Sequence, residues 1–401
     1  MDKENILVIN SGSSSVKFQL IDAETEETIV KGMAEKLGLD DAHIKIGFDG
    51  QTTDQTLGAT ATHTDAIRVL FEFLDANGLS ETILAVGHRV VHGGEKFTES
   101  VLITPEVIEQ IEEVTPFAPL HNPANLRGVE AIAKIDDKLP QVAVFDTAFH
   151  STMPPEAYRY SVPSDWYHKY GVRRYGFHGI SYDFITKKTA KILGKKPSEV
   201  NLVIAHIGSG TSIAAIKNGE SVSTTMGFTP LAGLPMGTRS GNIDPGVIPY
   251  IMEKEDLTAT EVVDQLNKKG GHKAIATVSD DVRDILVAMA KGDENAKLAL
   301  DIFTRKCAKY IGGFMTMLPS LDALVFTAGI GENGWETREA IVDRLAILGF
   351  KIDKAVNRKT IGFEGKEGLV SAKSSKYPIY ALGTDEAVMI ARDTAKATRQ
   401  K

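Results

Sequence analysis

An apolar strand followed by a Gly/Ser turn occurs twice in this chain, and this repeat constrains the fold more than any other feature. The first copy spans residues 6–22 and the second spans 201–216. Each copy has a buried-strand pattern, a small polar turn and a second strand. At an offset of 196 residues the turns align as Asn10/His206, Gly12/Gly208, Ser13/Ser209 and Ser15/Thr211. A repeat at the head of each half predicts two related domains.

The turn at 12–15 is rich in backbone N–H groups and hydroxyls, and Lys17 adds a cation. These are the groups that hold a phosphate. A Walker A loop is excluded, because its G-x-x-x-x-G-K-[ST] pattern is absent and no helix pattern follows. An ordinary hairpin turn is the alternative, and whether residues 13–15 touch phosphate or only shape the turn stays open. The second copy favours a pair of hairpins that clamp one polyphosphate.

Length and charge narrow the class of protein. A chain of 401 residues exceeds the usual size of one hydrophobic core, so two domains are expected. A formal net charge of −8 argues against nucleic acid or an acidic membrane surface as partner. A small anionic substrate remains compatible, because a few local arginines can outweigh the overall charge.

The single cysteine, Cys307, excludes a disulfide framework and a thiolate zinc site within the chain. The apolar run at 6–9 is too short for a signal peptide, and no run approaches the roughly 18 residues of a membrane span. We therefore expect a cytoplasmic protein without a membrane partner.

Periodicity and turn signals predict the elements around the two hairpins. An irregular aromatic stretch places a domain boundary near residue 150. The Gly-rich segment 328–334 is expected to be a turn after a strand, and Asn122 is a candidate cap for a helix that begins near Pro123. Strands are expected at 83–91, 141–145 and 377–382, and helices at 64–76, 105–114, 181–193, 336–348 and from 384 onward.

Three residues carry candidate chemistry. On a strand at 83–91, Arg89 and Val91 share one face, which suits a small carboxylate with a short alkyl tail. A surface arginine on an edge strand is the alternative. Asp146 follows a buried strand and is either a catalytic or metal-positioning carboxylate or a helix N-cap. His88 and His92 lack the helical H-E-x-x-H context of a zinc site.

A second arginine, Arg239, lies in a long irregular segment at 223–245 and is bracketed by small residues. Long loops without secondary structure in a compact protein are often functional. The small neighbours would leave the guanidinium accessible to a ligand.

Taken together, these segments resemble the acetate kinase (acetokinase) family over essentially the whole chain. The resemblance is carried by nine ordered motifs: VINSGSSSVK (8–17), HRVVHGGE (88–95), APLHNP (118–123), FDTAFH (145–150), RRYGFHG (173–179), HIGSG (206–210), MGTRSG (236–241), AGIGEN (328–333) and GTDE (383–386). It implies an α/β fold of two duplicated actin-like (ribonuclease H-like) domains around a central nucleotide cleft. The implied domains are 1–149 with 385–401, on the acetate and metal side, and 150–384, which binds the nucleotide.

The resemblance also implies the reaction of ATP with acetate to give ADP and acetyl phosphate, with Mg²⁺ and with Mn²⁺ as a substitute, in a homodimer. The implied catalytic residues are Asp146, Arg89, His178 and Arg239. The carboxylate and the methyl group of acetate would be bound by Arg89, Val91, Leu120, Phe177 and Pro230. The metal would be held by Asn10 and Glu386. The nucleotide would be bound by Lys17, His206, Ile207, Gly208, Ser209, Gly210, Asp281, Val282, Arg283, Gly329, Ile330, Gly331, Glu332 and Asn333.

Elementary chemistry agrees with these roles. Phosphoryl transfer needs in-line positioning and charge stabilisation more than covalent work by the protein. Acetate is already ionised at pH 7, so we expect Asp146 to orient the substrate or the hydrated Mg²⁺ more than to abstract a proton. Ser209 departs from the family's usual Asn, Asp280 from a usual Ser, and Ala232 from a common acidic residue.

Two alternatives remain at this stage. A propionate or butyrate kinase of the same fold is the nearest, because one methylene is worth only about 1–3 kcal/mol in a hydrophobic pocket. Val91 fits an acetate-sized pocket better than Ala would. A nucleotide-switched binding protein of the actin or Hsp70 type is the other alternative, and the two arginines speak against it. The apolar segment 305–318 is expected to be either core or subunit interface.

Overall fold

The computed structural model describes residues 4–399, which divide into two compact units. Unit 1 contains residues up to 151 together with those from 385 onward, and unit 2 contains residues 152–384. The sequence predicts nearly the same division, with residues 1–149 and 385–401 in the first domain and residues 150–384 in the second. Unit 1 is therefore discontinuous in sequence, whereas unit 2 is one continuous segment.

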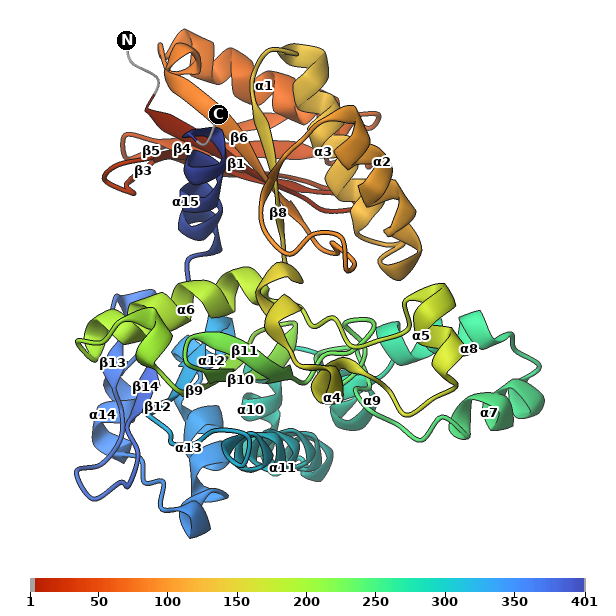
Figure 1. Ribbon diagram of the computed structural model, residues 1–401, viewed down its shortest axis with the longest axis vertical. Coiled ribbons are helices and arrows are strands. Elements are labelled where there is room, and N and C mark those ends of the chain that lie inside the picture. Colours follow the sequence, from red (N-terminus) through yellow and green to blue (C-terminus); the bar gives the residue numbers. More distant parts are fainter. Residues whose placement is uncertain (1–3, 400–401) are drawn as a thin grey trace. The chain divides into compact units, whose positions relative to one another are not determined.

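Unit 1 is built on an eight-stranded sheet in the order β5-β4-β3-β2-β1-β6-β8-β7 (Figure 1). Its strands are β1 (Asn5–Ser11), β2 (Val16–Asp22), β3 (Thr28–Glu35), β4 (His43–Phe48), β5 (Gln51–Thr56), β6 (Ile83–Val90), β7 (Val101–Leu102) and β8 (Gln141–Phe145). Its helices are α1 (His63–Ala76), α2 (Pro105–Glu113), α3 (Asn122–Ile135) and α15 (Glu386–Arg399).

Helices cover both faces of this sheet. Leu7 and Ile9 of β1 pack in one apolar cluster with α1 and α3. On the opposite face, α15 approaches so closely that a Cβ on Gly87 would lie 2.3 Å from the Thr394 hydroxyl oxygen. Figure 1 shows α15 against the sheet, away from α1 and α3. Burial on both faces accounts for the almost uninterrupted apolar run of β1.

Unit 2 is built on a six-stranded sheet in the order β11-β10-β9-β12-β14-β13. Its strands are β9 (Leu202–Ile207), β10 (Thr211–Lys217), β11 (Glu220–Thr224), β12 (Ala323–Thr327), β13 (Gly368–Leu369) and β14 (Ile379–Ala381). Its helices are α4 (Pro155–Tyr158), α5 (Ser164–Tyr170), α6 (Gly179–Ile192), α7 (Val247–Glu255), α8 (Ala259–Lys268), α9 (Gly271–Ala276), α10 (Val282–Ala290), α11 (Glu294–Met315), α12 (Ala328–Asn333), α13 (Trp335–Asp343) and α14 (Lys354–Lys359).

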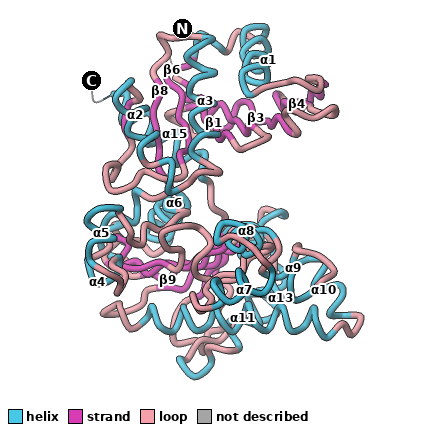
Figure 2. Tube along the Cα trace, turned by 90° about the vertical axis from the view of Figure 1, so that its right-hand side faces the viewer, coloured by secondary structure: helices cyan, strands magenta, loops and turns pink. Residues whose placement is uncertain are grey.

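The long helix α11 forms part of the core of unit 2. Figure 2 shows it running along the unit beside β9. Its buried residues Phe303, Cys307 and Ile311 pack against alternate residues of β9 and β10. This packing assigns the apolar side of segment 305–318 to the core.

The two sheets share one topology. In unit 1 the five strands β3-β2-β1-β6-β8 are joined by two antiparallel pairings and then two parallel pairings. In unit 2 the strands β11-β10-β9-β12-β14 repeat this order and these directions. An antiparallel edge strand, β7 or β13, follows in each sheet. The predicted α/β fold with duplicated halves is confirmed.

The residue pairings in the two hairpins correct one detail of the predicted repeat. In unit 1 the turn has four residues, because Ser11 pairs with Val16, whereas in unit 2 it has three, because Ile207 pairs with Thr211. Asn10 and His206 still occupy equivalent positions on the first strands. Thr211, however, is equivalent to Val16 and not to Ser15 as the constant offset predicted.

Four further expectations were wrong in detail. The strand predicted to reach Val91 ends at Val90. Asn122 does not cap α3, because its side-chain amide binds the backbone of His92. The Gly-rich segment predicted as a turn is the short helix α12, and the helix expected at 336–348 ends at Asp343. The predicted irregular segment around Arg239 is confirmed, since no helix or strand lies between Thr224 and Val247.

Within residues 4–399, no helix is long and apolar enough to cross a membrane.

Candidate active-site residues in each unit

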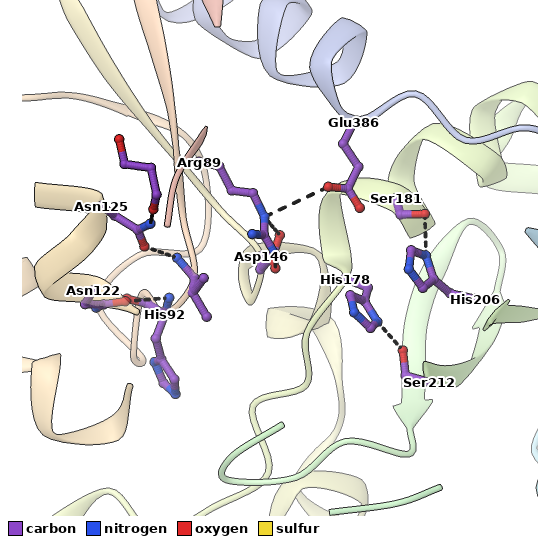
Figure 3. Close-up of polar contacts among 12 residues, drawn as sticks. Arg89, His92, Asn122, Asn125, Asp146, His178, Ser181, His206, Ser212 and Glu386 are labelled. Carbon is purple, nitrogen blue, oxygen red and sulfur yellow. Dashed lines mark hydrogen bonds and ion pairs between the residues drawn. The ribbon is translucent and has the colours of Figure 1, made fainter. Parts of the chain in front are cut away.

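The polar centre of unit 1 is an arginine held by two carboxylates. Arg89 lies near the end of β6, and Asp146 follows the end of the parallel neighbour β8, so both side chains emerge at one edge of the sheet. The Arg89 guanidinium donates through Nε and Nη2 to the two oxygens of Asp146. Glu386, at the start of α15, lies 3.9 Å from Arg89 Nε (Figure 3). The Arg89 side chain is half-buried, and β6 lies between β1 and β8, so the edge-strand alternative is wrong.

The charges of this cluster are strongly coupled. Burial by itself would lower the pKa of the Arg89 guanidinium, but the negative charges of Asp146 and Glu386 outweigh it and raise that pKa above its ordinary value. Burial raises the pKa of the Glu386 carboxyl, Arg89 opposes this effect, and Asp146 and Asp385 add to it. Arg89 therefore stays charged and oriented toward Asp146, whereas the ionised form of Glu386 is disfavoured.

The opening hairpin belongs to the same unit. Asn10 on β1 is directly opposite Lys17 on β2. Asn10 is half-buried and Lys17 is exposed. The ammonium of Lys17 acts to lower the pKa of Glu386, which places the hairpin's cation within electrostatic reach of the carboxylate cluster.

The donor set of Asn10 and Glu386 suits a hard divalent cation. Both side chains offer oxygen, and Mg²⁺ commonly takes only one or two protein ligands and keeps several waters. The carboxylates around Glu386 outnumber the nearby cations, so a divalent ion would relieve their repulsion. Among residues 4–399, no group of three or more His, Cys, Asp or Glu side chains is arranged to hold a metal ion, so such an ion would depend on water for its other ligands.

In unit 2 the focal residue is His178, which precedes α6 and has a left-handed backbone with φ of 59°. A non-glycine residue in this conformation often marks a functional site. Its Nδ1 lies 2.8 Å from the Ser212 hydroxyl, which also lies 2.6 Å from the hydroxyl of Tyr182. The ring stacks on His206 at 4.0 Å between centroids (Figure 3).

Gly210 lies where His178 and the second predicted arginine meet. A Cβ on Gly210 would lie 3.1 Å from His178 Nε2 and 4.0 Å from Arg239 Nη1. The pKa of Arg239 is lowered by burial, and among the described residues its side chain has a recorded hydrogen bond only to the sulfur of Met236. A half-buried guanidinium without a carboxylate in contact has the charge and the free donors to bind an anionic ligand.

The segments predicted to bind nucleotide lie next to one another in unit 2. A Cβ on Gly208 would lie 3.6 Å from Ala328 Cβ and 4.0 Å from the backbone nitrogen of Gly329. Near Arg239, a Cβ on Gly237 would lie 3.2 Å from the carbonyl oxygen of Asp280, which precedes the segment 281–283. The structure thus places the loop at 206–210 against the start of α12, and Asp280 against the segment that carries Arg239.

Several of the predicted nucleotide residues have structural bonds of their own. Glu332 accepts from the backbone N–H groups of Ala328 and Thr384. Asn333 donates to the carbonyl of Gly329 and accepts from the N–H of Phe363. Asp281 caps α10 and binds Arg283.

The residues predicted to surround the acetate methyl group are divided between the units. In unit 1, Val91 is buried and Leu120 is 62% exposed. In unit 2, Phe177 is buried immediately before His178, and Pro230 is half-buried in the loop that follows β11.

Sequence reasoning missed the residues that hold these groups in place. Tyr182 and Ser212 orient His178, and Asn125 binds the backbone of Val91. Tyr182 lies one helical turn after His178, so helical spacing could have identified it. Arg338 is fully buried behind α12, and no local pattern marked it.

Comparisons with known proteins extend over nearly the whole chain. The model of the acetokinase family matches residues 5–392. The acetate kinase of Thermotoga maritima is 48% identical over 397 residues, which cover 97% of each chain. Crystal structures of a Francisella tularensis propionate kinase and of Porphyromonas gingivalis acetate kinase align with TM-scores of 0.93 and 0.91 at 41% and 43% identity, each covering 98% of this chain and 99% of the other.

Proposed function

This chain belongs to the acetokinase family, and from that premise we propose that it transfers the γ-phosphoryl group of ATP reversibly to acetate, giving acetyl phosphate and ADP. The observation that carries the proposal is Arg239 beside His178 at Gly210, a cation without a carboxylate in contact among the described residues. Phosphoryl transfer requires fixed positive charge and hydrogen-bond donors around a group that is already anionic.

In this function Arg89 binds the acetate carboxylate, and Val91, Leu120, Phe177 and Pro230 contact the methyl group. Asp146 is a positioning residue in this scheme, because both of its oxygens are engaged by Arg89. It fixes the guanidinium so that the remaining donors face the substrate. No general base is needed, since acetate is ionised at neutral pH.

Arg239 and His178 stabilise the transferring phosphoryl group. A guanidinium and an imidazole that are held before the reaction need little reorganisation when charge redistributes over the phosphoryl oxygens. The Ser212 hydroxyl holds the His178 ring by its Nδ1, and the Tyr182 hydroxyl holds Ser212 in turn, so that Nε2 of His178 lies on the Gly210 side.

The nucleotide contacts residues 206–210, 281–283 and 329–333 of unit 2, and Lys17 contributes a cation from unit 1. Support comes from the contact between residues 206–210 and the start of α12, and from the open backbone at Gly329. At Gly329 no atom lies within 4 Å of an added Cβ, so a flat ligand can approach the chain closely there.

Asn10 and Glu386 would hold Mg²⁺, or Mn²⁺ in its place. Their oxygen donors and the excess of carboxylates around Glu386 support this assignment. The bound ion would neutralise phosphate charge as ATP binds.

A single-step assay tests the function. The protein is incubated with acetate, ATP, Mg²⁺ and hydroxylamine, and acetohydroxamate is measured by its ferric complex. We expect hydroxamate and ADP in equal amounts. ATP hydrolysis without hydroxamate would refute the transfer and support a nucleotide-switched binding protein instead.

Propionate is the second candidate acceptor, and the similarity to the Francisella propionate kinase supports it. The buried Val91 favours acetate, because its side chain fills space that a longer acyl chain needs. Comparison of kcat/KM for the two acids decides between them. A clear preference for propionate would overturn the acetate assignment.

A cytoplasmic homodimer is the state in which we propose that the enzyme works. Its cysteine is buried in α11, as suits a protein that needs no disulfide. The large apolar side chains of Val247 and Tyr250 on α7 are exposed and available to a second copy. Sedimentation equilibrium would show twice the chain mass of 43.4 kDa, and a monomer at micromolar concentration would exclude the dimer.

A further inference from the structure

A side-chain amide replaces a missing ladder bond between β1 and β6. These parallel strands are paired from Asn5 to Ile9, and beyond their paired residues the chains no longer bond to each other directly. Asn125 of α3 donates through Nδ2 to the carbonyl of Ser11 at 2.8 Å. Its Oδ1 accepts from the backbone N–H of Val91 at 3.0 Å. A carboxamide offers one donor side and one acceptor side, as a peptide group does, so Asn125 bridges the two chains where the ladder stops.

The surroundings make this bridge rigid. Asn125 is 3% exposed, and α3 lies so close to β1 that a Cβ on Gly128 would lie 2.3 Å from the Ser11 hydroxyl oxygen. Gly128 and Asn125 are three residues apart and therefore share one face of the helix. If α3 moved away from β1, the backbone groups of Ser11 and Val91 would lose their partner, and a buried peptide group without a partner is unfavourable.

The two ends of the bridge belong to different parts of the proposed site. Ser11 follows Asn10 of the proposed metal site, and Val91 is the proposed methyl contact. Asn125 thus fixes the distance between the opening hairpin and Val91, the residue proposed to contact the acyl chain. Both strands and the helix lie in unit 1.

We propose that Asn125 is a positioning residue that sets acyl-chain selectivity by holding Val91 relative to the opening hairpin. The proposal rests on the proposed function. Discrimination of one methylene in a hydrophobic pocket amounts to about 10- to 200-fold in kcat/KM, so a small displacement of Val91 is sufficient to alter it.

The neighbouring Asn122 provides a matched control. It lies on the same first turn of α3 and is also buried, but both of its bonds go to the backbone of His92, one residue beyond Val91. Loss of Asn122 therefore removes a comparable amide from the same helix without breaking the bridge to Ser11.

The experiment measures kcat/KM for acetate and for propionate in the wild type, Asn125→Ala and Asn122→Ala, together with KM for ATP and the melting temperature. For Asn125→Ala we expect the acetate-to-propionate ratio to fall at least about fivefold, because Val91 is no longer held. For Asn122→Ala we expect a ratio within about twofold of the wild type. KM for ATP should change little for Asn122→Ala, because the bonds of Asn122 do not reach the hairpin that carries Lys17.

The outcomes separate the two proposals. If Asn125→Ala keeps the wild-type ratio, or if both variants change it equally, the role of Asn125 is refuted. If the wild type forms no acyl phosphate from either acid, the proposed function fails first. Should Asn125→Ala not fold, Asn125→Asp keeps the volume and the acceptor but cannot donate to Ser11, and it should lower the ratio in the same way.

Discussion

At the scale of single residues, the two arginines differ in how their charge is balanced. Arg89 is neutralised by Asp146 within its own unit, whereas Arg239 has no carboxylate in contact among the described residues. The first arrangement fixes a guanidinium in one orientation, and the second leaves a positive charge to be compensated by a ligand. In the proposed reaction this difference assigns substrate orientation to Arg89 and transition-state stabilisation to Arg239.

Replacement of Arg239 by Ala should lower kcat by about 100-fold or more, because the charge it supplies is needed most in the transition state. Hydroxamate formation at saturating acetate and ATP measures the effect. Arg344→Ala is the control, since Arg344 binds Asp301 and Thr304, and none of these three residues belongs to the proposed site. A near-normal kcat for Arg239→Ala would show that the assigned role is wrong.

Glu386 links function to stability. Because burial raises the pKa of its carboxyl above the unfolded value, protonation is favoured in the fold, and stability falls as pH rises through the folded pKa. Glu386→Gln should therefore be at least as stable as the wild type at pH 8 without metal, and this advantage should shrink toward pH 4.

Calorimetry with and without Mg²⁺ measures this prediction. The wild type should gain melting temperature on adding Mg²⁺ with ADP, and Glu386→Gln should lose most of that gain together with activity. The exposed Glu109→Gln controls for the change in net charge. If Glu386→Gln were clearly destabilised at pH 8 without metal, the result would contradict the argument.

At the scale of elements, α12 shows what local sequence could not predict. Its glycines favour a turn, because glycine has low helix propensity. Side chains satisfy backbone groups at both ends of this helix. Glu332 accepts from the N–H of Ala328, and the guanidinium of Arg338 donates to the carbonyls of Gly331 and Glu332. These bonds join residues that are close in sequence, but helix propensity takes no account of them.

Arg338 also donates to the side-chain oxygen and the carbonyl of Asn357 and to the carbonyl of Thr360. Burial lowers the pKa of this guanidinium to about 10, so it stays charged at neutral pH. One buried cation thus joins the C-terminal ends of α12 and α14, where helix dipoles favour positive charge.

Arg338→Lys should lower the free energy of unfolding by about 3 kcal/mol or more, because an ammonium cannot reach both helix ends and leaves buried carbonyls unpaired. It should also raise KM for ATP more than KM for acetate, since α12 carries proposed nucleotide contacts. Urea unfolding and steady-state kinetics test both effects. Arg344→Lys, which changes a half-exposed ion pair with Asp301, should lower the free energy of unfolding by less than about 1 kcal/mol. Equal stability of the two variants would exclude the joining role of Arg338.

At the scale of the whole molecule, the sequence was most informative where a pattern repeats. The recurring hairpin predicted the duplicated topology, because each copy supplies the first two strands, in chain order, of the five-strand arrangement that the two sheets share. The positions of Arg89 near the end of β6 and of Asp146 directly after β8 were predictable, because both strands have apolar sequences. The hydrogen bonds of Asn125 and Tyr182 could not be predicted, because each joins segments that are distant in sequence and only the fold brings these segments together.

The last helix, α15, completes unit 1 from the far end of the chain. Its buried residues include Val388, Ile390 and Thr394, and it lies directly against β6 at Gly87. Deletion of residues 386–401 would expose one face of the sheet of unit 1 and remove Glu386. Unit 2, in contrast, is continuous in sequence and has its own core.

We therefore predict that the shortened chain loses the fold of unit 1 and keeps that of unit 2. Calorimetry should show one remaining transition with roughly half the unfolding enthalpy, because enthalpy scales with the number of folded residues. ADP should still raise the temperature of that transition, since the proposed loops at 206–210, 281–283 and 329–333 all lie in unit 2. Phosphoryl transfer should be absent. A shortened chain that unfolds completely, or one that no longer responds to ADP, would refute the independence of unit 2 as a nucleotide-binding body.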